Sequence, residues 1–279
     1  MDPRRGELSL GLAARTPPLT YRAFIPEEPT GQPALVLVHG RSRAAAPLFQ
    51  AFLPAAMTWN VPLLAPTFSR TRFPRYQQLA GVAGPLAARQ ALLAVLDDVR
   101  RELGPAAHRV NLLGFSGGAQ FAHRFALLTP HRVHRIAVVA AGWYTYLDPE
   151  LPFPLGVAPS ERSGGLSPNV DAFLRLPIHI MVGAEDTERD TGLRSTRIID
   201  RIQGKHRLIR AVRWLNHLEE SARIRGIRPR VTLDVLPKTS HSLRKAVVAG
   251  NLVTRAFDFF HLTRPIPEPP RTCDLEPLP

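Results

Sequence analysis

Short apolar runs alternate with amphipathic stretches along most of the chain. Runs such as Ala34–Val38 and Ile178–Val182 are continuously apolar, as expected for strands buried on both faces of a parallel sheet. The stretch Pro85–Leu103 instead repeats apolar residues at helical spacing, and Gly104 after it suits a helix end. This alternation predicts an α/β fold with a mostly parallel central sheet flanked by helices. The predicted strands are 19–25, 34–38, 61–65, 110–113, 136–141, 178–182 and 230–236, and the predicted helices are 47–59, 85–103, 119–128, 206–225 and 243–260.

The two ends and one internal segment depart from this alternation. Residues 1–18 carry leucines at alternate positions, which indicates an N-terminal extension or an edge strand. Residues 143–176 are rich in proline and glycine without clear periodicity, and we expect a short lid-like loop there. Residues 263–279 have the composition of a disordered tail. We therefore expect one domain over 19–262.

The N-terminus lacks the pattern of a signal peptide. Such a leader contains about 7–15 uninterrupted apolar residues, whereas Glu7, Ser9 and Gly11 interrupt the apolar run here. No window approaches the roughly 18 consecutive apolar residues of a membrane span. A single cysteine, Cys273, excludes an intramolecular disulfide. We expect a cytoplasmic protein without a membrane span.

Composition adds one unusual feature, an excess of positive charge. The chain of 279 residues is 44% hydrophobic and 21% charged, as in ordinary globular proteins. Lysine and arginine number 36 against 23 acidic residues, a net charge of +13, and only three of these cations are lysines. This charge favours either an anionic partner or the arginine-, alanine- and proline-rich composition of proteins from GC-rich genomes.

A glycine-rich pentapeptide contains the first candidate for chemistry. Residues 114–118 read Gly-Phe-Ser-Gly-Gly and fit the pattern G-x-S-x-G. In a nucleophile elbow this pattern stands between a strand and a helix, and glycines flank the serine because larger side chains would clash. A predicted strand ends before the motif and a predicted helix follows it, so Ser116 is the candidate nucleophile. The alternative is a strand-to-helix turn with an incidental serine.

A serine nucleophile needs a base, and an acid that orients the base. In proteins built around this elbow, the acid and then the histidine follow the serine along the chain. The loop GAEDTERD after strand 178–182 offers Asp186 as the preferred acid, with Glu185 and Asp190 as alternatives. Of the ten histidines, four follow this loop, and of these only His241 lies in a turn after a predicted strand. His241 is therefore the candidate base.

Two backbone N–H groups should stabilise the negative charge that develops on the carbonyl oxygen. Gly117, directly after the nucleophile, is the first candidate. The second should come from the loop after strand 34–38, which reads His-Gly-Arg-Ser. Arg41 is the preferred donor in this loop, and Ser42 is the alternative.

These four ordered elements resemble the α/β-hydrolase superfamily over about residues 19–262. More narrowly, SGGAQFAHRFALL followed by AAGWYT resembles bacterial esterases related to polyhydroxybutyrate depolymerases and feruloyl esterases. The resemblance implies an α/β-hydrolase fold with little lid, and a serine esterase that cleaves carboxylic esters through a Ser-His-Asp triad and an acyl-enzyme. Secreted members of the group carry signal peptides, so we expect a small-molecule ester inside the cell.

Aromatic residues after strand 136–141 are candidates for substrate binding. Trp143 and Tyr144 could line an acyl or alcohol pocket, or they could pack beneath the proline-rich segment. The chain contains no Walker A, G-x-G-x-x-G or H-E-x-x-H pattern. We therefore expect neither a cofactor nor a metal ion.

Two other functions remain open. An amidase or peptidase would use the same three residues, because bond preference depends on the shape of the pocket. A basic binding protein would use residues 194–230, which hold 11 lysines and arginines against three acids. Within helix 206–225, however, an apolar stripe should leave most arginines on an exposed face; the stripe consists of Leu208, Val212, Leu215 and Ala222. Without aromatic residues suited to base stacking, we expect no nucleic-acid partner. The oligomeric state is open.

Overall fold

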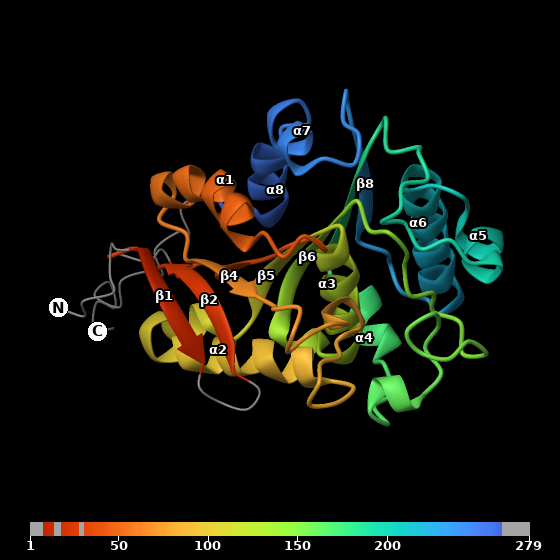
Figure 1. The fold of residues 1–279 in the computed structure, drawn as a ribbon, viewed down its shortest axis with the longest axis horizontal. Coiled ribbons are helices and arrows are strands. Elements are labelled where there is room, and N and C mark those ends of the chain that lie inside the picture. The colour runs from red at the N-terminus through yellow and green to blue at the C-terminus, as the bar shows by residue number, and fades with distance from the viewer. Residues whose placement is uncertain (1–7, 14–17, 28–30, 264–279) are drawn as a thin grey trace, which may run out of the picture.

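The computed structural model describes residues 8–13, 18–27 and 31–263. In this part of the chain, eight strands form one sheet in the order β1-β2-β4-β3-β5-β6-β7-β8 (Figure 1). β1 with β2 and β2 with β4 are antiparallel pairs, and all other neighbours are parallel. The strands are β1 (Leu8–Ala13), β2 (Leu19–Phe24), β3 (Leu35–Val38), β4 (Leu63–Thr67), β5 (Val110–Phe115), β6 (Val133–Val139), β7 (Ile178–Gly183) and β8 (Val231–Leu236). The mostly parallel sheet predicted from the sequence is confirmed.

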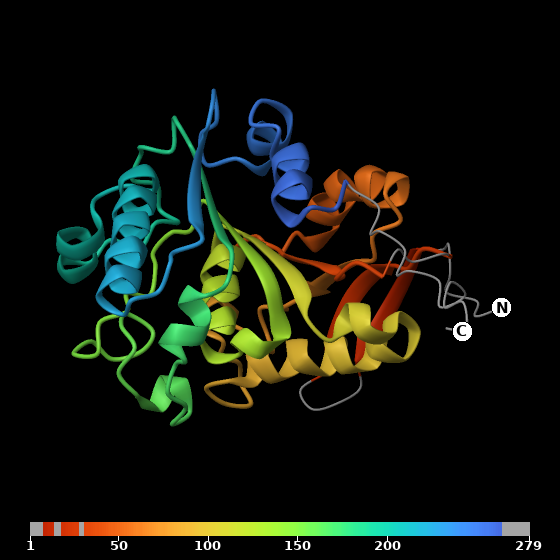
Figure 2. The same cartoon turned by 180° about the vertical axis from the view of Figure 1, so that it is seen from behind.

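Helices cover both faces of the sheet (Figures 1 and 2). One face carries α1 (Ala45–Thr58), α7 (Leu243–Val248) and α8 (Leu252–Phe260). The other face carries α2 (Ala87–Leu103), α3 (Gly117–Leu128) and α6 (Arg207–Ile224). Two further short helices are α4 (Val170–Leu174), whose Phe173 and Leu174 join the core on the second face, and α5 (Arg197–Gln203), which lies beside α6.

Successive residues of β3 enter opposite cores. Leu35 and Leu37 pack with α1 and α8, whereas Val36 and Val38 pack with α2 and α3, and all four are fully buried. The side chains of a strand alternate between its two faces. The continuous apolar run in the sequence therefore reflects a strand with helices on both sides.

The predicted helix 243–260 is wrong in one respect, because the structure divides it into α7 and α8. A Cβ atom at Gly250 would lie 2.7 Å from the carbonyl oxygen of Ala246, and Asn251 has a positive φ of 50°. The chain therefore leaves the helix at these two residues. The apolar spacing on both sides continues across the break, so periodicity alone conceals it.

The buried face predicted for α6 is correct only in part. Ala222 is fully buried, whereas Leu208, Val212 and Leu215 are only partly buried. Two arginines also face inward, because carboxylates and carbonyl oxygens from other segments receive their N–H groups. The buried residues of α6 are Arg207, Arg210, Ala211, Trp214, Leu218, Ser221 and Ala222.

The segment 143–176 differs from a simple lid-like loop. Its first residues, from Trp143 to Leu147, are buried in the core, and it contains α4, which Asn169 caps by accepting a hydrogen bond from the Ala172 N–H. At the N-terminus β1 is an edge strand, one of the two alternatives for residues 1–18. The predicted tail lies outside the described residues except for residue 263. Within the described ranges, no helix combines the length and apolar character needed to cross a membrane.

Candidate active site

Ser116 lies in a strained turn between β5 and α3. Its φ and ψ angles are 55° and −109°, a conformation that non-glycine residues rarely adopt. Its N–H donates to the Val139 carbonyl at 2.8 Å and so anchors the turn to β6. A Cβ at Gly114 would collide with the backbone of Gly118, and a Cβ at Gly118 would collide with the Val38 carbonyl. Glycine at these two positions therefore allows α3 to begin directly against β5 and β3.

The structure brings the three predicted triad residues together at the carboxyl ends of their strands. Asp186 follows β7 and His241 follows β8, the neighbouring strand. His241 Nε2 lies 2.9 Å from Ser116 Oγ, and His241 Nδ1 lies 2.8 Å from Asp186 Oδ2. Because a carboxylate can only accept, Nδ1 carries the proton and Nε2 can accept the serine proton. Phe115 stacks on the His241 ring, with 5.6 Å between ring centroids.

The second carboxylate oxygen of Asp186 contacts a buried cation. Arg207 Nη1 lies 3.3 Å from Asp186 Oδ1, and both side chains are only 2% exposed. Arg207 also donates to both carboxylate oxygens of Asp190, at 2.6 and 3.1 Å, and these hydrogen bonds lower the pKa of Asp190. Asp190 thus pairs with Arg207, and Glu185 pairs with Lys245 at 3.4 Å. Neither alternative acid contacts the histidine as Asp186 does.

The two predicted oxyanion donors are neighbours in space. A Cβ at Gly117 would lie only 3.2 Å from the backbone nitrogen of Arg41, so the two backbones approach closely beside Ser116. Neither of these N–H groups has a hydrogen-bond acceptor within the described part of the chain. Both are therefore available to a substrate oxygen.

Two buried side chains hold the loop that contains Arg41. His39 Nε2 accepts from the Phe68 N–H at 3.0 Å, and His39 Nδ1 donates to the Gly40 carbonyl at 2.8 Å. The Tyr76 hydroxyl donates to the His39 carbonyl at 2.7 Å. Burial lowers the pKa of His39 to about 4, so its ring stays neutral and can accept this hydrogen bond. No sequence motif points to Tyr76, because its partner is 37 residues away.

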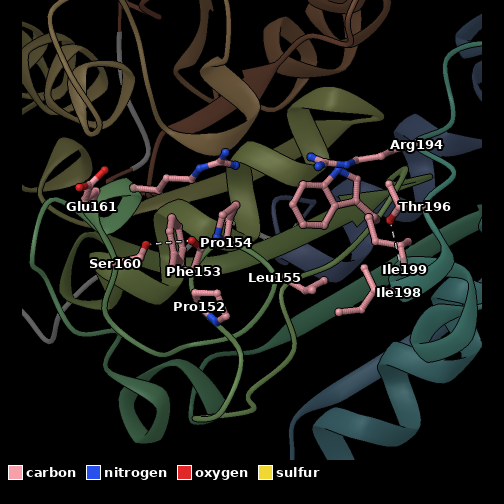
Figure 3. A pocket seen from close by; sticks show the side chains of 12 residues that line it. Pro152, Phe153, Pro154, Leu155, Ser160, Glu161, Arg194, Thr196, Ile198 and Ile199 are labelled. Atoms are coloured by element: carbon pink, nitrogen blue, oxygen red, sulfur yellow. Dashed lines mark hydrogen bonds between the residues drawn. The ribbon is translucent and has the colours of Figure 1, made fainter.

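Trp143 and Tyr144, the two predicted substrate-binding residues, have different environments. Trp143 lines a cavity of about 290 Å³ together with Arg41 and Gln120. A second cavity, of about 430 Å³, is drawn in Figure 3. It adjoins the first, since Trp143 and Arg194 line both. Tyr144 is instead fully buried and stacks on Trp214, with 4.4 Å between ring centroids. Tyr144 therefore packs in the core, which was the alternative to substrate binding, and its prediction as a substrate-binding residue is wrong.

Metal binding has no evident site in the described ranges. No three histidine, cysteine, aspartate or glutamate side chains there lie close enough together to hold an ion. The expectation that neither a metal nor a cofactor is used stays a prediction.

Solved structures with similar folds include hydrolases. Poly(aspartic acid) hydrolase-1 from Sphingomonas sp. KT-1 is 27% identical, with a TM-score of 0.75 over 90% of this chain and 99% of that one. LpqC, a poly(3-hydroxybutyrate) depolymerase from Bordetella parapertussis, is 24% identical, with a TM-score of 0.73 over 90% and 95%. An esterase from Pyrobaculum calidifontis is 14% identical, with a TM-score of 0.57 over 92% and 86%. No protein-family model matches this chain, and no curated protein matches its sequence.

The strand order, the elbow between β5 and α3, and these neighbours define an α/β-hydrolase fold. The resemblance and the fold class predicted from the sequence are thereby confirmed. The similarity to hydrolases supports a hydrolase as the class of protein.

Proposed function

We propose that this protein is a serine hydrolase that cleaves carboxylic esters. Ser116 attacks the ester carbonyl carbon while His241 Nε2 takes its proton, and Asp186 orients the ring and stabilises its charged form. The backbone N–H groups of Gly117 and Arg41 bind the oxyanion. His241 then gives the proton to the departing alcohol, and a water molecule hydrolyses the acyl-enzyme. In this proposal the substrate is a small ester in the cytoplasm, and the reaction needs no cofactor.

The continuous contact from Ser116 Oγ through His241 to Asp186 Oδ2 carries this proposal. The contacts join residues 125 and 55 positions apart in the chain, so no local turn accounts for them. Backbone strain of the kind found at Ser116 costs about 1–3 kcal/mol and persists where the surrounding structure imposes it. A serine with a purely structural role would need neither the strain nor a base held by a buried carboxylate.

Covalent labelling and turnover test the proposal together. The wild-type protein should react with a fluorophosphonate at Ser116 and hydrolyse short p-nitrophenyl esters. Ser116→Ala should abolish labelling and lower kcat by about 10⁴-fold or more. Ser167→Ala removes an exposed serine outside the site and should change neither property. Folded wild-type protein that is not labelled and cleaves no short ester would refute the proposal.

Amide hydrolysis by the same residues is the second candidate. The similarity to a hydrolase of poly(aspartic acid), a polymer of amide-linked units, favours it. Esters and amides with the same acyl group should be compared, because amides are intrinsically much less reactive. An amide whose kcat/KM is within about tenfold of that of its ester would indicate a site adapted to amides.

A further inference from the structure

The cavity that Arg41 lines has a cationic character. Arg41 and Arg194 contribute the charge, and no acidic residue from the described ranges lines it. It lies near the nucleophile because one of its lining residues is Arg41, whose backbone nitrogen would be only 3.2 Å from a Cβ at Gly117, the residue after Ser116. The lining residues are Arg41, Gln77, Gln78, Gln120, Trp143, Thr191, Gly192, Leu193 and Arg194. The Asp190 carboxylate, which accepts from the N–H of the lining residue Gly192, is itself paired with Arg207. The side-chain amides and guanidinium groups of the lining therefore suit a negatively charged group.

Arg194 presents a guanidinium group that is available for binding. Its side chain is exposed and lies over the Trp143 ring, 5.1 Å from the ring centroid. Within the described part of the chain it makes no side-chain hydrogen bond or ion pair. Its backbone is fixed, because the buried Arg210 donates to its carbonyl at 3.1 Å and also to the Gly142 carbonyl. Arg210 thereby ties the loop with Arg194 to the segment with Trp143.

A second cation stacks on the same tryptophan from within the core. Arg124 is fully buried, with its guanidinium 4.0 Å from the Trp143 ring centroid. It has no carboxylate partner, and its Nη2 atom has no hydrogen-bond partner among the described residues. Burial lowers the pKa of Arg124, and repulsion from Arg194 lowers it further. A negative charge bound at Arg194 would offset this repulsion.

The second cavity gives room for the rest of a substrate. It is lined by apolar residues that include Pro152, Pro154 and Leu155, and its volume is about 430 Å³. Figure 3 shows Glu161 and Arg194 on opposite sides of it. An aliphatic or aromatic group can therefore lie on an apolar surface next to Arg194.

We propose that the substrate of this site bears a carboxylate, which Arg194 binds with Arg41 as a second donor. The proposal rests on the esterase function and adds the substrate class. A planar guanidinium pairs with a carboxylate through two parallel N–H···O bonds, a geometry that an ammonium group lacks. The Arg41 side chain already donates to the Gly192 carbonyl at 3.0 Å, which holds it beside the cavity. The carboxylate belongs to the acyl part or to the alcohol part of the ester.

Matched pairs of esters test the proposal and locate the carboxylate. On the acyl side, mono-p-nitrophenyl adipate is compared with its methyl ester. On the alcohol side, 4-carboxyphenyl butyrate is compared with 4-(methoxycarbonyl)phenyl butyrate. In one pair, the carboxylate compound should have a kcat/KM about tenfold higher at low salt. This preference should shrink as sodium chloride is added, because salt screens exposed charges.

Variants assign the preference to a residue. Arg194→Ala and Arg194→Gln should each bring the ratio of kcat/KM within the preferred pair close to one. Arg197→Ala removes the same charge three residues further along the chain, from an exposed side chain that does not line the cavity. It should leave both the ratio and the overall activity unchanged.

The possible results distinguish failure of the carboxylate proposal from failure of the esterase proposal. Equal kcat/KM values within both pairs, with turnover that depends on Ser116, would overturn the carboxylate proposal and leave the esterase function intact. A preference that survives in Arg194→Ala, or that Arg197→Ala also removes, would overturn the role of Arg194. Failure of folded wild-type protein to cleave any of the four esters would refute the esterase function, and the substrate class with it.

Discussion

A neutral His39 ring makes the protein sensitive to acid at the loop that carries Arg41. The ring is fully buried, its Nε2 accepts from the Phe68 N–H, and its Nδ1 donates to the Gly40 carbonyl. Protonation would place a second donor against the Phe68 N–H. Burial accordingly lowers the pKa of His39 from 6.5 to about 4. In the unfolded chain the ring titrates near its ordinary value.

The shift in pKa sets the size and the sign of the effect. Between pH 6.5 and about 4, the unfolded chain binds a proton at His39 that the folded protein does not bind. Stability therefore decreases as the pH falls through this interval, by about 1.4 kcal/mol per pH unit. The loss attributable to His39 amounts to about 2 kcal/mol at pH 5 and about 3 kcal/mol at pH 4. Above pH 7.5 the residue contributes almost no pH dependence.

His39→Gln isolates this contribution, because a glutamine carbonyl can accept from Phe68 but does not titrate. Guanidinium unfolding followed by circular dichroism gives the free energy of unfolding of both proteins at pH 7.5 and pH 5. On acidification, the wild-type value should fall by about 2 kcal/mol more than the variant's. His217, whose pKa burial also lowers to about 4, is present in both proteins, so its effect cancels. An equal fall in the two proteins would refute the reasoning.

Two further predictions concern the supports of the site. Arg207→Met leaves Asp186 buried without its cation and should lower the free energy of unfolding by about 3 kcal/mol. Arg213→Met, at an exposed position on the same helix, should lower the free energy of unfolding far less. Thermal denaturation compares the two variants, and an equal decrease in melting temperature would contradict the role of the ion pair. Gly118→Ala places a Cβ against the Val38 carbonyl and should lower the free energy of unfolding by more than about 2 kcal/mol. Gly40→Ala should lower the free energy of unfolding by less than about 1 kcal/mol, because the nearest atom to its new Cβ would be the Ser116 Cβ at an ordinary 3.5 Å. Calorimetry compares the two alanine variants, and equal stability would contradict the close packing at Gly118.

Local patterns were enough to predict most of the secondary structure. Each of the seven predicted strands overlaps an observed one. In the centre of the sheet the reason is that a strand with helices on both sides must be apolar at every position, as β3 is. The division of 243–260 was not predictable from apolar spacing. It depends on a close approach of Gly250 to the Ala246 carbonyl and on the positive φ of Asn251, neither of which changes the periodicity.

The proposed triad was predictable because each member follows its own strand. Parallel strands end at one edge of the sheet, so Ser116, Asp186 and His241 could be placed together from chain order alone. The burial of Tyr144 was not predictable, since a residue after a strand can point towards a site or into the core. Tyr144 points into the core because it stacks on Trp214, a residue of the distant helix α6.

The sequence by itself determined the parallel sheet, the elbow and the order of the candidate residues, because hydrophobic periodicity and glycine requirements are local properties. Only the tertiary structure decided which arginines are buried and which are exposed. Arg207 and Arg210 turn inward because carboxylates from other segments neutralise them and carbonyl oxygens accept their N–H groups. Arg194 instead lies exposed at the cavity that Arg41 also lines, with the Trp143 ring beside it and no hydrogen-bond or ion-pair partner from the described ranges. The role of a charge depends on the groups that surround it, and folding brings those groups from distant parts of the chain.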